Sequence, residues 1–446
     1  MYPIELKSVR IPLALLALGL FTLPASPSQA ASATEVVDSF ANDEAFGGGY
    51  ASAQWGMTFH RGPILREFLC LAHDTAAGGG ATLCPSGSTI LDARELWMER
   101  QVMFTNIDLT VGFWRHASLS LHLPLIISDT TELRYDNSVN SGNSSVDPYN
   151  QPSLFAVPNQ GAVRAGLGDP SLWLRFNPIS WARDNTRPTW ALDLGVTIPT
   201  PMVKEANNTL VGEGLVKLDL ATAVSARPAA WIEPYFRSGV TLPIRAGKTL
   251  FQDYNGATQT LVIPGATIEG RIGMELIPWE LRDDSRHFTV DVGGRVAFTF
   301  EGREYTGLFD ALGNSDCDPS NAENSCDLTT YDRDANEPAS QRRKTDGITD
   351  VDQYATLGTW LRLRYRPVRG FQLALGVTGD FEMPHFLTFA DAGSDLDEQN
   401  AVELENEKGI NEYNPVYADG IDYPGNRFRS GGIWSVGFTV DAQWRF

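Results

Sequence analysis

An alternation of apolar and polar side chains recurs along almost the whole chain and constrains the fold more than any other feature. In the last ten residues, GFTVDAQWRF, the apolar set is Phe438, Val440, Ala442, Trp444 and Phe446. A period of two is typical of β-strands, because successive side chains of a strand point to opposite faces. The same period occurs in segments 50–59, 106–113, 119–126, 171–176, 189–198, 216–224, 231–244, 267–276, 287–300, 355–365 and 371–381. No segment has a convincing helical period, so the sequence predicts an all-β fold with about twelve strands.

The connections between these segments alternate between short and long. The short ones are 114–117, 179–188, 227–230, 279–286 and 367–370, and the long ones are 60–95, 129–163, 201–214, 245–264, 304–350 and 388–430. A soluble β-sandwich has no reason to sort its loops in this way. A membrane barrel has short periplasmic turns and long extracellular loops. We therefore expect residues 50–446 to form a transmembrane antiparallel up-and-down β-barrel of about twelve strands.

The first thirty residues have the organisation of a secretory signal peptide. Lys7 and Arg10 precede an apolar run over 11–24, and small residues end the segment at Ala30. A membrane-anchoring helix needs about 20 apolar residues, and this run is shorter. We expect residues 1–30 to be a signal peptide and residues 31–49 to be an N-terminal segment that either plugs the lumen or lies in the periplasm. No later stretch is apolar enough to cross a membrane as a helix.

The net charge of −20 argues against a nucleic-acid partner, whose phosphates need a basic surface. Segment 304–350 has eleven acidic and four basic residues, and segment 388–430 has ten acidic and three basic residues. Both segments are predicted extracellular loops, so the outward end of the barrel is expected to be strongly acidic.

Four cysteines fit an oxidising compartment. Among three pairings, the economical one joins Cys70 to Cys84 and Cys317 to Cys326, and both disulfides would then lie within long loops. A metal site is the alternative, but the spacing lacks the CxxC pairs that zinc prefers. We expect no metal ligands.

Aromatic residues gather beside the short turns, where a girdle at the periplasmic membrane surface would place them. The predicted girdle consists of Trp114, Trp231, Trp279, Trp444 and Phe446. Trp434 precedes Trp444 by ten residues, which is about 25 Å along the membrane normal for a strand tilted by about 40°. The terminal phenylalanine also resembles the C-terminal signal of bacterial outer-membrane proteins, which implies recognition by the barrel-assembly machinery.

The opposite face of the strands is polar and carries both signs of charge. The residues predicted to line the lumen or pore are Glu233, Arg237, Glu269, Arg271, Glu275, Asp291, Arg295, Arg362, Arg364 and Asp380. Eight strands leave room only for side chains, whereas sixteen to eighteen leave a water channel. These residues could therefore form a charge ladder that fills the lumen, or a narrow pore whose selectivity they set.

Part of the chain resembles a known family. A strand ending in Leu-Pro at Pro124, the segment GLGDPSLWLRF (166–176) with Gly166, Gly168 and Asp169, and a strand ending VTIPTP (196–201) look like the outer-membrane transporter family associated with phenol and other aromatic-compound degradation. The resemblance covers about a third of the chain. It implies passive uptake of small solutes, hydrophobic or aromatic ones among them.

Two other classes of function fit twelve strands. Outer-membrane phospholipases use a serine activated by histidine, but the histidines here, including the inward His122, show no recognisable Ser/His signature. A closed barrel could instead act through its loops as a surface binding module. Segment 316–327 is rich in oxygen ligands but lacks the spacing of a calcium loop.

These observations predict an outer-membrane channel of a Gram-negative bacterium for passive passage of small solutes. We expect no catalytic residues and no cofactor. The expected partners are outer-membrane lipid, the barrel-assembly machinery during biogenesis and a small-molecule solute, with no nucleic acid.

Overall fold

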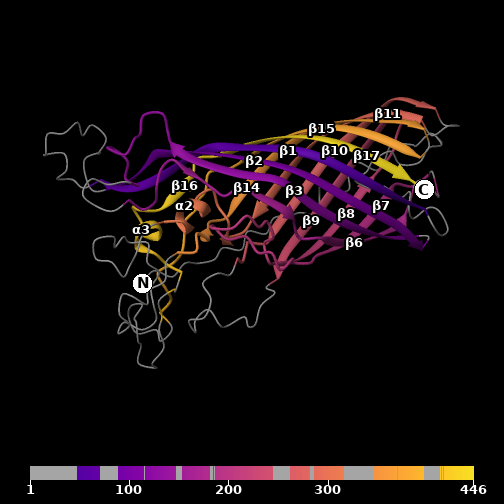
Figure 1. Cartoon of the computed structure of the whole chain (residues 1–446). Coiled ribbons are helices and arrows are strands. Elements are labelled where there is room, and N and C mark those ends of the chain that lie inside the picture. Colours follow the sequence, from indigo (N-terminus) through magenta and orange to yellow (C-terminus); the bar gives the residue numbers. More distant parts are fainter. Residues whose placement is uncertain are drawn as a thin grey trace, which may run out of the picture.

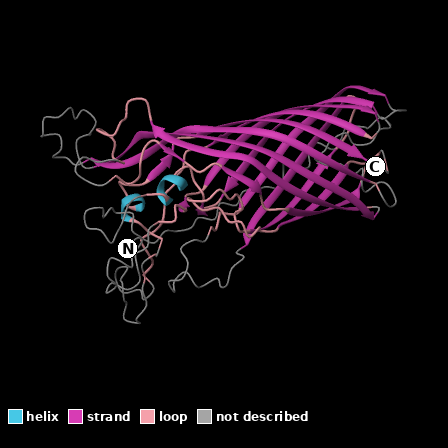
Figure 2. Cartoon of the chain, viewed as in Figure 1, coloured by secondary structure: helices cyan, strands magenta, loops and turns pink. Residues whose placement is uncertain are grey.

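Twelve long strands close into one antiparallel barrel (Figures 1 and 2). The computed structural model describes residues 48–70, 89–114, 116–146, 153–180, 184, 186–244, 262–281, 286–315, 345–368, 370–395, 412, 414 and 416–446. The barrel strands are β1 (Gly49–Cys70), β2 (Thr89–Trp114), β3 (Ala117–Tyr135), β6 (Ser171–Ile179), β7 (Thr189–Thr197), β8 (Val216–Ser225), β9 (Ile232–Ile244), β10 (Thr267–Leu281), β11 (Arg286–Thr299), β14 (Tyr354–Val368), β15 (Phe371–Glu382) and β17 (Ile433–Arg445). Each contains one of the predicted alternating segments or falls one residue short of it, so the predicted fold class and strand number are confirmed.

The first and last strands close the barrel. β1 pairs with β2 on one side and with β17 on the other, in a register that runs from Tyr50 opposite Arg445 to Arg61 opposite Trp434. At the end of this seam, the Gly49 amide donates to the Phe446 carbonyl at 2.9 Å, and the Phe446 amide donates back at 3.0 Å. Within the ring every barrel strand is paired on both sides, which is the condition for exposing a sheet to lipid, and the projecting residues 67–70 of β1 and 89–95 of β2 pair only with each other.

The other neighbours follow chain order, and the strands are inclined to the barrel axis (Figure 1). The connections at the end where the C-terminus lies are short: residues 115–116 join β2 to β3, residues 282–285 join β10 to β11, and residues 369–370 join β14 to β15. We call this the short-turn end. The opposite end, where β1 and β2 project beyond the other strands, is called the long-loop end.

The structure corrects several predicted loop boundaries. Residues 60–70 and 89–95 were expected in a long loop, but they belong to β1 and β2. The β1–β2 backbone pairing continues through this region. Ile64 and Leu96 are fully buried there against loop residues, so the side chains no longer show the alternation of an exposed apolar outer face. Segment 129–163 likewise contains the end of β3 and the short β4 (Asn159–Gln160), and β5 (Arg164–Leu167) follows it.

The two acidic loops also contain regular structure. Segment 304–350 includes α2 (Phe309–Gly313) and most of the hairpin formed by β12 (Gly302–Glu304) with β13 (Thr349–Val351). Segment 388–430 includes α3 (Asp419–Asp422) and β16 (Phe428–Ser430), which pairs with β1. The helices are one turn long, too short for a sequence period to reveal.

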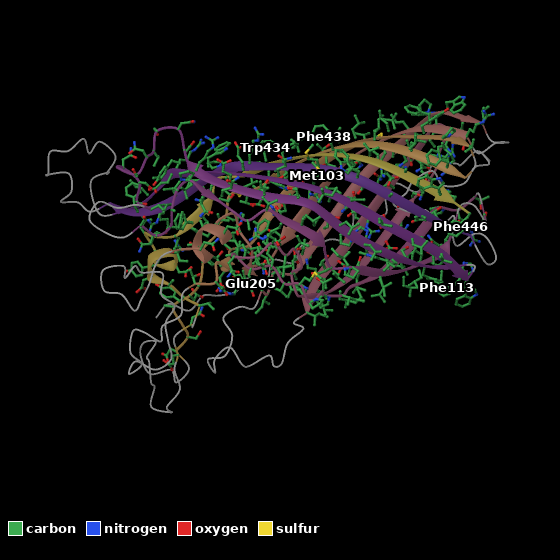
Figure 3. The ribbon with its side chains drawn as sticks, in the orientation of Figure 1. Met103, Phe113, Glu205, Trp434, Phe438 and Phe446 are labelled. Carbon is green, nitrogen blue, oxygen red and sulfur yellow. The ribbon has the colours of Figure 1, made fainter. Side chains whose placement is uncertain are left out.

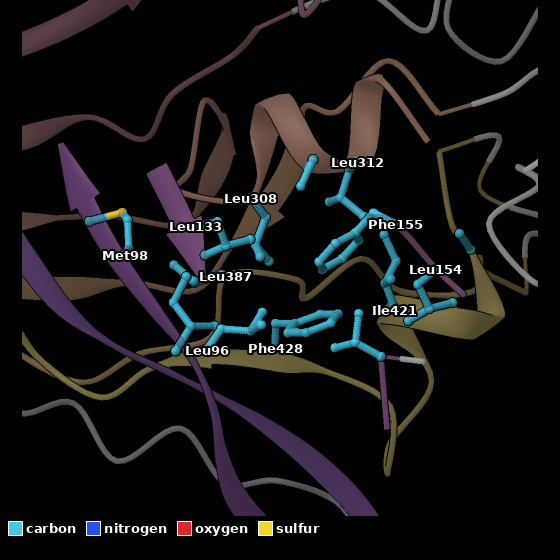
Figure 4. Close-up of a cluster of buried hydrophobic side chains, with 14 residues drawn as sticks. Leu96, Met98, Leu133, Leu154, Phe155, Leu308, Leu312, Leu387, Ile421 and Phe428 are labelled. Carbon is cyan, nitrogen blue, oxygen red and sulfur yellow. The ribbon is translucent and has the colours of Figure 1, made fainter. Parts of the chain in front are cut away.

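The largest apolar core lies among the loops at the long-loop end and not inside the barrel (Figure 4). We call this cluster the cap, and its members are Ile64, Leu96, Met98, Leu133, Val146, Leu154, Phe155, Leu308, Ala311, Leu312, Leu387, Ala418, Ile421 and Phe428. A second cluster beside it includes Phe309, Ala206 and Leu215. The described parts of the long loops therefore fold together at the long-loop end of the barrel.

Several predictions fall on other parts of the chain. The signal peptide and nearly all of the N-terminal segment 31–49 lie outside the described residues. The same holds for Cys84, Cys317, Cys326 and the side chain of Cys70, so both disulfides stay predictions. No helix in the described ranges is long and apolar enough to cross a membrane.

Candidate functional site

The two faces of the barrel have opposite chemistry. On β17, the outward side chains of Trp434, Phe438 and Trp444 are exposed, whereas Asp441 and Gln443 on the inner face are buried. Figure 3 labels Trp434 and Phe438 along β17, with Phe113 and Phe446 at the short-turn end. A water-soluble protein buries its large apolar side chains and exposes its charged ones. This barrel does the reverse.

A polar cavity of about 680 Å³ occupies the middle of the barrel, and we call it the chamber. Its charged lining residues are Asp108, His122, Arg175, Asp193, Asp219, Arg237, Glu269, Arg271, Arg362 and Asp441. Hydroxyl and amide side chains fill most of the remaining wall, and the aromatic lining residues are Tyr50 and Trp173. The volume is typical of a site for a small molecule.

Four of the predicted lumen residues line the chamber: Arg237, Glu269, Arg271 and Arg362. Arg271 is ion-paired with Glu269, and the Arg362 Nη2 atom lies 3.7 Å from an Asp441 oxygen. Arg237 shares Asp193 with Arg175, whose Nε lies 2.7 Å from that carboxylate. Both signs are therefore present at the chamber wall, and most charges are paired, either within one strand, between neighbouring strands or across one intervening strand.

Arg295 and Asp380 form a further pair toward the long-loop end. The Arg295 Nε atom lies 2.8 Å from an Asp380 oxygen, and its Nη1 atom lies 3.6 Å from Glu269. These contacts link β10, β11 and β15, so one guanidinium ties together strands that are not direct neighbours.

The remaining predicted residues form a buried group near the short-turn end, which we call the short-turn network. Arg364 contacts Glu275 at 2.6 Å and Asp291 at 3.4 Å, and the Tyr235 hydroxyl donates to Asp291 at 2.7 Å. Glu233 accepts a hydrogen bond of 2.8 Å from a serine on β8. All these side chains are buried, so they form an internal ladder and not a water-lined wall.

The predicted girdle residues lie at the short-turn end and face outward. Trp114, Trp231, Trp444 and Phe446 each expose half or more of their surface, and Trp279 exposes 39%. Trp279 on β10 stacks on Tyr365 on β14, across the intervening β11, with 6.5 Å between the ring centroids. The outer surface therefore carries a band of large aromatic side chains at this level.

An ion pair fastens the cap to the barrel. Arg164 on β5 donates two hydrogen bonds, at 3.0 and 2.5 Å, to the carboxylate of Asp310 in α2. Both side chains are almost completely buried. A bidentate charged pair of this kind is strong and directional, so it fixes the position of α2 over the mouth.

Two titratable side chains at the long-loop end, Lys204 and Asp422, have shifted pKa values. Burial lowers the pKa of Lys204 to about 8, with a further contribution from Arg100. The Lys204 Nζ atom lies 4.8 Å from the ring centroid of Tyr305 and 5.1 Å from that of Phe309. Burial also raises the pKa of Asp422 in α3 to about 7.

The chamber contains an Asp–His pair but no serine completes it. The His122 Nδ1 atom lies 2.5 Å from Asp108, and Ser52 donates to the same carboxylate at 3.1 Å. No serine hydroxyl of the described chain hydrogen-bonds to His122. Within the same ranges, no group of three histidine, cysteine or acidic residues could hold a metal ion.

Neither the role of Trp173 in the chamber wall nor the cap was predicted from the sequence. The alternation of SLWLRF already places Leu172 and Leu174 outside and therefore Trp173 inside, next to Arg175, so a signal was present. The cap residues gave no such signal, because their contacts join loops that are distant in the sequence.

No family model and no curated protein matches the chain. Among solved structures, the chain is similar to an outer membrane channel from Pseudomonas putida F1, with 8% identity, a TM-score of 0.40, and coverage of 95% of this chain and 100% of that one. A Pseudomonas aeruginosa FadL homologue has 9% identity, a TM-score of 0.32, and coverage of 88% and 90%. The outer membrane protease OmpT from Escherichia coli has 7% identity, a TM-score of 0.31, and coverage of 90% and 97%. At these values the function has to be argued from the site itself.

Proposed function

We propose that this protein is an outer-membrane channel of a Gram-negative bacterium through which small solutes pass passively. The observation that carries this proposal is a closed barrel with an apolar outside and a polar internal chamber of about 680 Å³. Outward apolar side chains need lipid, and a polar cavity inside the barrel needs water or a solute.

The aromatic residues support a membrane position for the barrel. Trp434 and Trp444 on β17 are both strongly exposed and stand ten residues apart. At about 3.3 Å per residue and a tilt of about 40°, this separation corresponds to an apolar band of about 25 Å. Indole rings prefer the two membrane surfaces, so these residues would mark the upper and lower limits of the band.

The lining of the chamber favours a solute that is itself polar over at least part of its surface. Buried polar groups must keep hydrogen-bond partners when a solute replaces water, and a purely apolar solute offers none. The rings of Tyr50 and Trp173 provide the apolar contact that a mixed solute needs. Uptake of aromatic compounds, which the family resemblance implies, stays a prediction.

Reconstitution in planar bilayers tests the channel. We expect discrete conductance steps whose cation preference increases in Arg362→Glu and Arg295→Glu, because both substitutions replace a lumen cation with an anion. Arg187→Glu is the matched control, since Arg187 is exposed outside the lumen. It should leave the selectivity unchanged.

A closed barrel that acts through its surface loops is the second candidate. It is favoured by the cap over one end and the buried short-turn network near the other. A folded protein that produces no conductance would reject the channel in favour of this alternative. A lipid hydrolase has less support, because His122 has no hydroxyl partner in the described chain. Ester hydrolysis by the protein in detergent would indicate such an enzyme.

A further inference from the structure

The indole ring of Trp173 lies against the backbone of Gly195 on the wall of the chamber. In the register of the sheet, Trp173 on β6 is opposite Gly195 on β7. A Cβ atom at Gly195 would lie 2.8 Å from the Cδ2 and Cε3 atoms of the indole ring. Glycine at this position therefore allows the ring to rest directly on the β7 backbone, with its other face toward the chamber that it lines.

The ring is held in place and its free face has no stacking partner. The Trp173 Nε1 atom donates a hydrogen bond of 2.9 Å to the Ser171 hydroxyl, which fixes the orientation of the indole. Among the described residues, no second ring and no cation is stacked on Trp173. The free face of an indole carries negative electrostatic potential and attracts cations.

Asp219 is the next inward residue along the same row. It is opposite Gly195 on one side and Thr241 on the other, and it accepts a hydrogen bond of 2.5 Å from the Thr241 hydroxyl. Neighbouring strands are about 4.8 Å apart, so a ring that rests on Gly195 lies beside this carboxylate.

The other carboxylates of the chamber differ from Asp219 in their partners. Asp193 and Glu269 each bind an arginine, and Asp441 faces Arg362. No arginine, lysine or histidine of the described chain forms an ion pair with Asp219. Lys217, two residues before Asp219 on β8, acts on it electrostatically but is ion-paired with Glu213. Asp108 pairs with His122, so Asp219 is the chamber carboxylate without an ion-pair partner among the described residues.

Space for a ligand group is available beside this row. Ala221 and Gly239 are opposite each other in the sheet, both line the chamber, and neither has a side chain larger than a methyl group. Their small size adds no bulk to the chamber wall beside Asp219. The Arg237–Asp193 ion pair crosses β8 on the side of Ala221 that is away from Asp219.

We propose that the chamber contains a subsite for an organic cation, a primary or quaternary ammonium group, between the face of Trp173 and the carboxylate of Asp219. This inference rests on the proposed channel and names the class of solute it takes. A π face and a carboxylate together recognise ammonium groups, which each element alone binds weakly. The net charge of −20 would also raise the local concentration of cations at the protein surface.

Calorimetry with choline tests the subsite without requiring transport. The protein folded in detergent micelles is titrated with choline and, separately, with the neutral alcohol in which carbon replaces the choline nitrogen. We expect choline to bind at least about tenfold more tightly than its neutral counterpart, because the two share shape and differ in charge. Equal affinities would overturn the proposal.

Variants locate the binding. Asp219→Asn and Trp173→Leu should each weaken choline binding by about tenfold, and Trp173→Phe should recover part of the loss because it keeps a π face. Glu205→Gln removes an exposed loop carboxylate and should have no effect. Barrel folding of each variant is checked by circular dichroism. Unchanged affinity in the folded Asp219 and Trp173 variants would reject this position.

Failure of the subsite and failure of the channel give different results. A protein that conducts in planar bilayers but does not bind choline would reject the subsite and keep the channel. A protein that binds choline at Asp219 but never conducts would keep the subsite and reject the channel.

Discussion

Arg364 and Glu275 form an ion pair of 2.6 Å inside the barrel, and neither side chain reaches solvent. The two residues lie on β14 and β10, which are separated by β11. Arg364 also contacts Asp291 on the intervening strand at 3.4 Å. The pair therefore connects three strands through side chains, in addition to the backbone ladder.

Removal of one partner of this pair should destabilise the barrel strongly. Arg364→Ala leaves Glu275 buried without its cation, and a buried unpaired charge typically costs about 3–5 kcal/mol. The measurement is urea unfolding in detergent micelles followed by tryptophan fluorescence. The double variant Arg364→Met with Glu275→Leu should recover part of the loss, because it removes the Glu275 charge together with its cation, while Asp291 keeps the hydrogen bond from the Tyr235 hydroxyl. Equal destabilisation in the single and double variants would contradict this interpretation.

The Arg164–Asp310 pair should control the opening of the cap. Arg164→Met breaks the two hydrogen bonds to α2, and loss of about 3 kcal/mol would speed amide hydrogen exchange in residues 309–313 by roughly a hundredfold. The matched control is Arg134→Met, which breaks an exposed pair with Glu99. Exposed pairs contribute less than about 1 kcal/mol, so exchange in α2 should not change. Slow exchange in both variants would mean that the pair does not hold the cap.

Strand position and strand number could be predicted from the sequence because the outer face of the barrel is apolar and the inner face is polar, which imposes a strict period of two. Leu361 and Leu363 face outward while Arg362 and Arg364 face inward, and each identity follows from its parity. The same parity marked Glu275 and Asp291 as inward. Parity could not distinguish Arg362 at the chamber from Arg364 in the short-turn network. It shows which face a residue is on, but not how far along the barrel axis the residue lies.

The cap could not be predicted for a different physical reason. Phe155, Leu308 and Phe428 come from three loops, and their contact depends on how those loops cross above the barrel. Arg164 and Asp310 are 146 positions apart in the sequence. A local pattern has no information about such a pair.

The closing seam should be sensitive to side-chain size at Gly49. An added Cβ atom would lie 2.6 Å from the Thr110 carbonyl oxygen on β2 and 2.9 Å from the Phe446 ring, so Gly49→Leu pushes β1 away from the β2 backbone and from the terminal phenylalanine. We expect the variant to lose at least about 2 kcal/mol of stability, or to fail to fold, because the clash involves the backbone. Heat-modified mobility of the folded barrel on a denaturing gel measures this. Gly270→Leu is the control, since nothing lies within 4 Å of its Cβ position. Equal folding of both variants would contradict the seam assignment.

Protonation of Asp422 should stabilise the cap at acidic pH. Burial raises its pKa from 3.8 to about 7, despite hydrogen bonds from the amides of Ala418 and Ala390 and the charge of Arg303; the carboxylate of Asp350 raises it further. The native state therefore binds more protons than the unfolded state between these values, so stability is full below about pH 4 and is lost as the pH rises through about 7.

Hydrogen exchange in residues 416–430 measures this effect. Asp422→Asn cannot titrate, so the difference between the variant and the original protein isolates the contribution of this residue, up to about 4 kcal/mol. This comparison also separates the effect of Asp422 from that of His385. Burial lowers the pKa of His385, so its contribution to the free energy of unfolding decreases as the pH falls below 6.5, opposite to that of Asp422. Parallel pH profiles of the two proteins would show that Asp422 is not the group responsible.

Lys204 should make the neighbouring part of the cap more stable as the pH rises from about 8 to above 10. Its pKa is lowered from 10.5 to about 8 by burial and by Arg100 and Arg164, while Asp129 and Asp310 act in the opposite direction. The unfolded state therefore binds more protons in this window, and the free energy of unfolding increases with pH, by up to about 3 kcal/mol. Hydrogen exchange in residues 302–315 should slow accordingly, with β15 as the internal reference. Lys204→Met is neutral at every pH, so its exchange should already be slow at pH 7 and should lack this dependence. An unchanged alkaline profile in this variant would assign the effect to another group.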